Sequence, residues 1–141
     1  MPTGKPVDFH QAGKRHFSDA ELLRTHARNA AAGQLYGFAA ECGIKFLLIK
    51  QGYPTDPTTG ELVDRHVKIH INKLVQTINT LLEGRNAAQY LANIPHFADF
   101  FDWATDHRYY LDSHIPPSLS KWQNASREVM LMLDQLLLDM P

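Results

Sequence analysis

The sequence predicts an all-α protein, an up-and-down bundle of four long helices plus one short helix. Apolar residues recur at helical spacings of three and four, no stretch alternates as a strand does, and Gly- and Pro-rich stretches separate the periodic segments. A length of 141 residues favours one domain. We assign it to residues 18–141, and we expect residues 1–17, which lack periodicity, to be a flexible lead-in.

The first helix is expected to run from Ser18 to about Gly52. Ser18-Asp-Ala-Glu21 has the pattern of a capping box, and few helix-breaking residues follow. Gly33, Gly37 and Gly43 interrupt this helix. They either let another helix approach closely or are tolerated locally, and the sequence leaves both alternatives open.

The remaining helices follow from periodicity and from proline. Residues 53–63 contain two prolines and predict a surface loop, after which a second helix is expected over about 64–83. A short helix is expected at 87–93, a third long helix at about 96–113 and the last at about 117–139. The last helix has apolar residues outside its main stripe, which favours an interface in a two-fold dimer: Met130, Leu131, Leu137 and Leu138.

Charge and composition exclude several classes of protein. The formal net charge is −1, so no global basic field is present to capture nucleic acid. Cys42 is the only cysteine, which excludes an internal disulfide and a Cys-cluster zinc site. The chain has neither an apolar run long enough for a membrane span nor a secretory signal, so we expect a cytoplasmic protein without membrane contact.

Arg108 and His114 are the most informative residues of the expected third helix. On a helix they would flank its apolar face about 120° apart. A guanidinium and an imidazole suit phosphate chemistry. In the structural alternative, Arg108 pairs with Asp112 at i+4 and His114 caps carbonyls at the helix end.

Two segments resemble the HEPN family (higher eukaryotes and prokaryotes nucleotide-binding), which is common among bacterial toxins and phage-defence proteins. Gln34-Leu-Tyr-Gly-Phe-Ala-Ala-Glu-Cys-Gly-Ile-Lys-Phe-Leu-Leu48 resembles the family's "AE…K.LL" signature. Arg108-Tyr-Tyr-Leu-Asp-Ser-His114 fits its Arg-x(4–6)-His motif before the final helix. The resemblance covers residues 18–139 and implies a HEPN-like helical fold.

The resemblance implies a metal-independent endoribonuclease, a hydrolase without a cofactor, whose paired motifs meet in a homodimer. His114 would be the general acid or base when a ribose 2′-OH attacks the adjacent phosphate, and Arg108 would stabilise the developing charge. The expected product end is a 2′,3′-cyclic phosphate. The candidates for assisting or contacting RNA are His107, Tyr109, Asp112 and Ser113.

The family also implies alternatives. Tyr109 stands where many active members have a small polar residue, and Pro116 stands where some toxins carry a tyrosine that a partner modifies. A separately encoded antitoxin, such as a nucleotidyltransferase-type protein, is the further partner that the family suggests. The alternative function is a non-catalytic module that binds a nucleotide or a partner protein. The intact motif favours the ribonuclease, whereas the near-neutral charge favours the module.

His66 and His70, four residues apart with Asp64 close by, are the candidate metal ligands. No third ligand is evident in the sequence, so we predict no metal site. A surface row of histidines that contacts RNA with Lys68 and Lys73 is the favoured interpretation.

Overall fold

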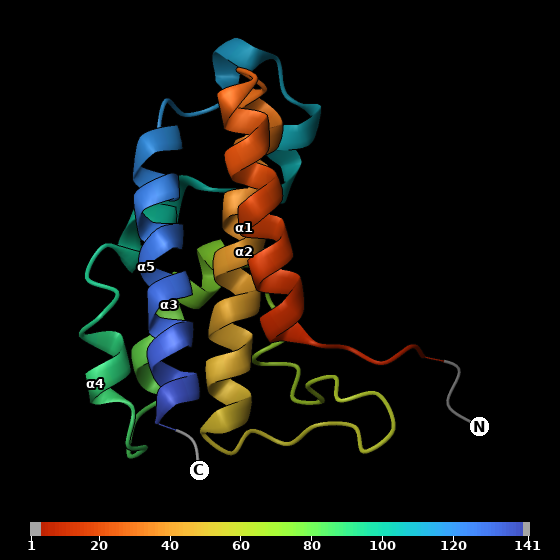
Figure 1. The fold of residues 1–141 in the computed structure, drawn as a ribbon, viewed down its shortest axis with the longest axis vertical. Helices are drawn as coiled ribbons and strands as arrows, with labels where there is room; N and C mark the ends of the chain where they lie inside the picture. The colour runs from red at the N-terminus through yellow and green to blue at the C-terminus, as the bar shows by residue number, and fades with distance from the viewer. Residues whose placement is uncertain (1–3, 140–141) are drawn as a thin grey trace.

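The computed structural model describes residues 4–139 and confirms the all-α class (Figure 1). Within that range there are four long α-helices, one short α-helix and three 3-10 helices, and no β-strand. The elements are, in order, α1 (Phe9–Thr25), α2 (Asn29–Lys50), α3 (Ile71–Leu81), α4 (Ala88–Leu91), η1 (Phe97–Asp102), η2 (Thr105–Tyr109), η3 (Asp112–His114) and α5 (Leu119–Leu138). The number of long helices agrees with the prediction, but the helices themselves differ.

The expected first helix is in fact two antiparallel helices, α1 and α2, which lie side by side in Figure 1. The turn between them has the hydrogen bonds of a Schellman motif, from Arg28 N–H to the Leu23 carbonyl (2.8 Å) and from Ala27 N–H to the Arg24 carbonyl (3.0 Å). Ala27 occupies the left-handed position, with φ = 58°. Glycine usually fills this position, so the sequence carries no signal for the turn.

The N-terminal boundary was also predicted wrongly. Helix α1 begins at Phe9, with Asp8 as N-cap accepting a hydrogen bond from the Gln11 N–H (2.9 Å). Residues 9–17 are therefore helical rather than a flexible lead-in, and Ser18 lies inside α1. Asp8 and Gln11 themselves have capping-box spacing, which was the overlooked signal.

Helix α3 is shorter than predicted and starts at Ile71. The Asp64 carboxylate accepts a hydrogen bond from the backbone N–H of His66 (2.8 Å) and lies 2.9 Å from the His66 ring Nδ1. Such local side-chain contacts with the backbone favour a turn over a helix here. Residues 53–63 form the predicted loop. The short helix α4 and the last helix α5 both lie within their predicted ranges.

The third long helix, predicted at 96–113, does not exist. Its place is taken by η1, η2 and η3, because pairs of extended residues interrupt the helical turns. Trp103 and Ala104 have ψ near 142° and 145°, and Tyr110 and Leu111 have ψ near 155° and 145°. The helical stripe inferred from 100° per residue therefore does not apply to this segment.

The glycines of α2 permit close packing, which decides between the two alternatives. A Cβ on Gly37 would stand 2.1 Å from Trp103, one on Gly43 2.4 Å from Val129, and one on Gly33 3.0 Å from Trp122. Both tryptophans are almost fully buried. The small residues of α2 therefore admit the indole rings and α5 against its backbone.

Helix α5 (blue in Figure 1) packs on α2 and leaves part of its surface exposed. Met130, expected outside the core-facing stripe, is buried, whereas Leu131, Leu137 and Leu138 are exposed as expected. Among the described residues, no helix is both long and apolar enough to cross a bilayer.

We expect Gly37→Ala to lower the free energy of unfolding by about 2 kcal/mol. The clash with the rigid, buried Trp103 outweighs the gain of about 1 kcal/mol in helix propensity. Chemical denaturation measures the change, with Gly33→Ala as the comparison, because its contact with Trp122 is looser. An unchanged or raised stability of Gly37→Ala would contradict the close approach.

We expect Ala27→Gly to raise the free energy of unfolding by about 0.5–1 kcal/mol. Glycine removes the left-handed strain of about 1–2 kcal/mol, and its greater freedom in the unfolded chain offsets part of that gain. The control is Ala31→Gly, in the helical first turn of α2, which should destabilise by up to about 1 kcal/mol. Thermal and chemical denaturation should both rank the variants in this order.

Candidate functional site

The segment that carries the Arg–His motif crosses the end of the bundle where α1 ends and α2 begins (Figure 1). Its upstream end is tied to α2 by two side-chain hydrogen bonds. The Trp103 indole N–H donates to the Gly33 carbonyl (2.9 Å), and the Gln34 amide donates to the Ala104 carbonyl (2.8 Å). Segment 102–118 contains no α-helix, so these contacts with α2 help to fix its path.

Asp102 ties the same segment to α5. Its carboxylate accepts hydrogen bonds from the Ser118 hydroxyl and from the Trp122 indole N–H (3.0 Å). Ser118 directly precedes α5, so one carboxylate holds both ends of the motif-bearing stretch to the same helix start. Most residues between these anchors are exposed, and we call residues 105–117 the motif segment.

His107 lies inside the bundle rather than on its surface. It is 6% exposed, and its ring stacks on Trp122 at 5.8 Å between centroids and lies 5.5 Å from the Tyr110 ring. Burial holds the pKa of His107 below its ordinary value, so the neutral ring is favoured. Its place indicates that it supports the motif segment from beneath, and it does not present a ring to solvent as an RNA-contacting residue would.

Arg108 and His114 are both exposed, at the ends of η2 and η3. The Arg108 guanidinium lies over the Tyr109 ring, 4.9 Å from its centroid. Within residues 4–139 no ion pair involves Arg108 or Asp112, and no side-chain hydrogen bond involves His114. The Arg108–Asp112 ion pair of the structural alternative is thus absent from the described residues, and Arg108 contacts Tyr109 instead.

The motif segment also displays large apolar side chains. Tyr109 is 75% exposed and Leu111 71%, with Tyr110 about half exposed, and Phe101 just before the segment is 70% exposed. Four of the nine large apolar side chains that the structure leaves exposed thus fall between residues 101 and 111. We call the three consecutive residues Tyr109, Tyr110 and Leu111 the apolar patch. Such a concentration around two unpaired polar groups is typical of a surface that another molecule covers.

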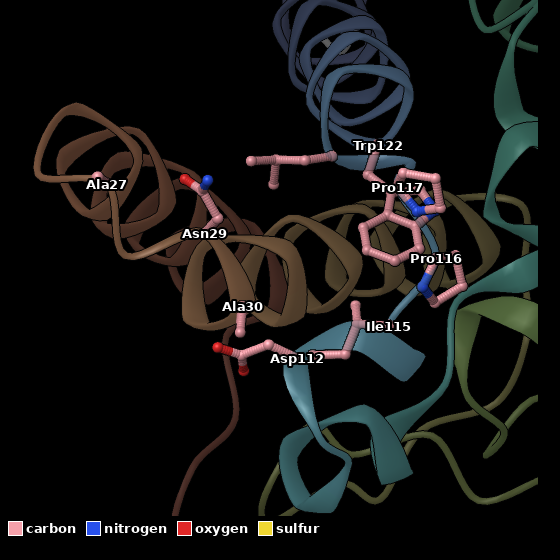
Figure 2. Close-up of a pocket in the computed structure, with 9 residues that line it drawn as sticks. Ala27, Asn29, Ala30, Asp112, Ile115, Pro116, Pro117 and Trp122 are labelled. Carbon is pink, nitrogen blue, oxygen red and sulfur yellow. The ribbon is translucent and has the colours of Figure 1, made fainter.

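A cavity of about 430 Å³ opens beside the motif segment. Figure 2 shows its two ends, with Asn29 and Ala30 of α2 and the Asp112 carboxylate on one side and the apolar side chains around Trp122 on the other. The apolar wall consists of Ile115, Pro116, Pro117, Leu119 and Trp122. The predicted assisting residues Tyr109, Asp112 and Ser113 are all exposed, and Asp112 also lines this cavity.

His66 and His70 do not share a helix face as predicted. His66 lies in the loop beside Asp64, and His70 directly precedes α3. The His70 ring Nδ1 lies 3.0 Å from the buried Glu41 carboxylate, which also accepts the Ile71 N–H (3.0 Å). Glu41 additionally forms an ion pair with Lys45, four residues further along α2 (3.1 Å).

The Glu41–His70 pair is a polar centre that sequence reasoning missed. The signal in the sequence was Glu41, a carboxylate on a helix of mostly apolar residues. Its partner His70 is 29 residues away and lies in a loop, so the pair could not be assigned. In this position Glu41 caps α3 from outside the helix, and the pair reads as a structural link between α2 and α3. In the part of the chain that the structure describes, no three His, Cys, Asp or Glu side chains are grouped to hold a metal ion.

Comparisons of the chain with protein-family models, curated proteins and solved structures found no match. The HEPN resemblance therefore stays a prediction that depends on residues 34–48 and 108–114 alone.

Proposed function

We propose that this protein is a metal-independent endoribonuclease in which Arg108 and His114 act in a composite site formed by two copies of the chain. The observation that supports it most is that both side chains are exposed and have no ion-pair partner among the described residues, and that the exposed apolar residues lie between them in the sequence. An exposed guanidinium that no carboxylate holds is available to bind a phosphate.

The chemistry follows from the two side chains. A neutral His114 imidazole accepts the proton of a ribose 2′-OH while the 2′ oxygen forms a bond to the adjacent phosphorus. The bond from phosphorus to the 5′ oxygen breaks, and the 5′ oxygen takes a proton from a protonated imidazole. Arg108 donates hydrogen bonds to the phosphate oxygens, on which negative charge increases in the transition state. The products are a 2′,3′-cyclic phosphate and a 5′-hydroxyl end.

The acid and the base of this reaction are best supplied by two imidazoles. Within one chain the motif offers only His114 at the surface, because His107 is buried against Trp122. A two-fold axis through the apolar patch would place two His114 rings and two Arg108 side chains around one phosphate. Covering the patch would also remove Tyr109 and Leu111 from water, which favours association.

We expect purified protein to cleave RNA in the presence of EDTA and to leave 2′,3′-cyclic phosphate ends. His114→Ala should lower the rate by about 10²–10⁴-fold, and Arg108→Ala by about 10²–10³-fold, because proton transfer and charge stabilisation are lost. Exposed Arg127→Ala, remote in sequence from the motif, is the matched control and should retain activity. Full activity in both motif variants would end this proposal.

We expect a mass of twice 16.0 kDa by light scattering at micromolar concentrations. Leu111→Glu should shift this mass towards the monomer and abolish cleavage, because it places a charge in the apolar patch. Leu131→Glu, on the exposed face of α5 at 61% exposure, is the control and should leave the dimer intact. A dimer that Leu131→Glu disrupts and Leu111→Glu does not would place the interface on α5 instead.

The second candidate function is a non-catalytic module that binds a nucleotide or a partner protein. The cavity beside the motif segment is the observation that favours it, since a ligand site requires no transfer chemistry. A protein that binds RNA or nucleotides at the motif but never cleaves RNA would support this second function over the first.

A further inference from the structure

We infer that the cavity between the first turn of α2 and residues 112–122 binds a guanine base of the RNA, next to the Arg108–His114 motif. This inference rests on the proposed ribonuclease for its ligand being RNA. Guanine-selective binding and RNA cleavage are measured separately, so either proposal can fail alone.

The cavity has the size and the composition of a base-binding site. Its volume of about 430 Å³ lies in the range of about 300–1,000 Å³ that is usual for small-ligand sites. Five apolar residues line one end, and polar groups lie only at the other (Figure 2). Proteins that hold an unstacked base combine an apolar wall for its faces with hydrogen bonds to its edge.

Asp112 supplies the acceptors at the polar end. Figure 2 shows its carboxylate beside the α2 end of the cavity. Within residues 4–139 the structure records no hydrogen bond or ion pair to this carboxylate. Both oxygens are thus free to accept from a ligand, and a carboxylate that a ligand covers requires such donors to offset its lost hydration.

The first turn of α2 supplies donors close to that carboxylate. Its N-cap residue, Arg28, makes no side-chain capping hydrogen bond. The backbone N–H groups of Asn29 and Ala30 belong to the first turn, where a helix offers no internal acceptor. In Figure 2 the Asn29 side-chain amide points away from the Asp112 carboxylate, so the backbone N–H groups are the donors at this end.

Guanine matches this pairing of donors and acceptors. Along one edge it presents the O6 acceptor followed by two donors, N1–H and the N2 amino group, which can bond the two oxygens of one carboxylate. In adenine and cytosine an unprotonated ring nitrogen adjoins the amino group and would face the carboxylate with a lone pair. Uracil has a single ring N–H between two carbonyls. Guanine is therefore the standard base that satisfies Asp112 and α2 together.

Position links this cavity to the cleavage site. Asp112 lies within the motif, two residues before His114, and opens η3, which ends at His114. A base held against Asp112 therefore has its own phosphates close to the motif segment. We expect cleavage next to guanine as a consequence.

A structural alternative exists for Asp112. A carboxylate near the start of α2 also stabilises that helix through its dipole, by about 0.3–1 kcal/mol. In that case Asp112→Asn would lower the stability of the fold without changing the preference among bases. The two roles are separable by measuring base preference and thermal stability on the same variant.

The test uses the full chain with His114→Ala, so that bound RNA stays intact. Fluorescence anisotropy compares oligoadenylate RNAs that carry guanine, inosine or adenine at one central position. We expect guanine to bind about ten-fold or more tighter than adenine. Inosine, which lacks the 2-amino group, should lie between them, and Asp112→Asn should remove the difference. Equal binding of the three RNAs, or a guanine preference that survives Asp112→Asn, would overturn the inference.

A second pair of variants tests the cavity itself. Ala30→Leu places a larger side chain in the cavity wall and should weaken binding of the guanine RNA about ten-fold. Ala31→Leu, the next exposed residue of α2, lies outside the lining and should leave it unchanged. Equal effects of the two variants would place the guanine elsewhere.

Further outcomes distinguish an RNA ligand from a free nucleotide, and the guanine site from the ribonuclease. Guanosine monophosphate that binds as tightly as the guanine RNA would make the ligand a free nucleotide and overturn the assignment to RNA. Guanine-selective binding by a wild-type protein that never cleaves RNA would contradict the ribonuclease and leave the cavity assignment standing. Cleavage without any preference for guanine would support the ribonuclease and contradict the assignment of the cavity to guanine.

Discussion

The close contact between the Trp103 indole and the backbone of Gly37 is the constraint on which the rest of this structure depends. A helix that carried any side chain at this position could not accept the ring, which also donates its N–H to the Gly33 carbonyl. To reach α2, the backbone at Trp103 and Ala104 is extended, and this interrupts what periodicity alone predicts as a long helix. The motif segment consequently follows an irregular path across the end of the bundle.

The sequence predicts correctly those elements that are determined by residues close together in the chain. The range of α5 follows from its periodicity and the preceding prolines, and α4 and the proline-containing loop were found for similar reasons. The turn at Ala27 was missed because it uses alanine where glycine is usual. Residues 97–114 were wrongly predicted to be one helix because a tertiary contact with α2 determines their conformation. The spacing of apolar residues does not reveal such a contact.

The candidate site divides in the same way. Arg108 and His114 could be selected from the sequence, because their residue types and spacing carry the signal, and the structure places both at the surface. The cavity could not be predicted, since its walls come from the start of α2 and from residues more than 80 positions later. Nor could Glu41 be assigned to α3, because the helix it caps lies far along the chain. The burial of His107 likewise follows from its stacking on Trp122 in another helix.

The double attachment of Asp102 has a consequence for the order of events during biosynthesis. The motif segment contains no α-helix of its own, and its downstream anchors are Ser118 and Trp122, at the start of the last helix. A ribosome exposes α1 and α2 first, and these can pair at once, since a short turn joins them. Arg108 and His114 acquire their fixed positions only after α5 has emerged and docked. A nascent chain therefore carries the residues of its candidate site for some time before it has the site.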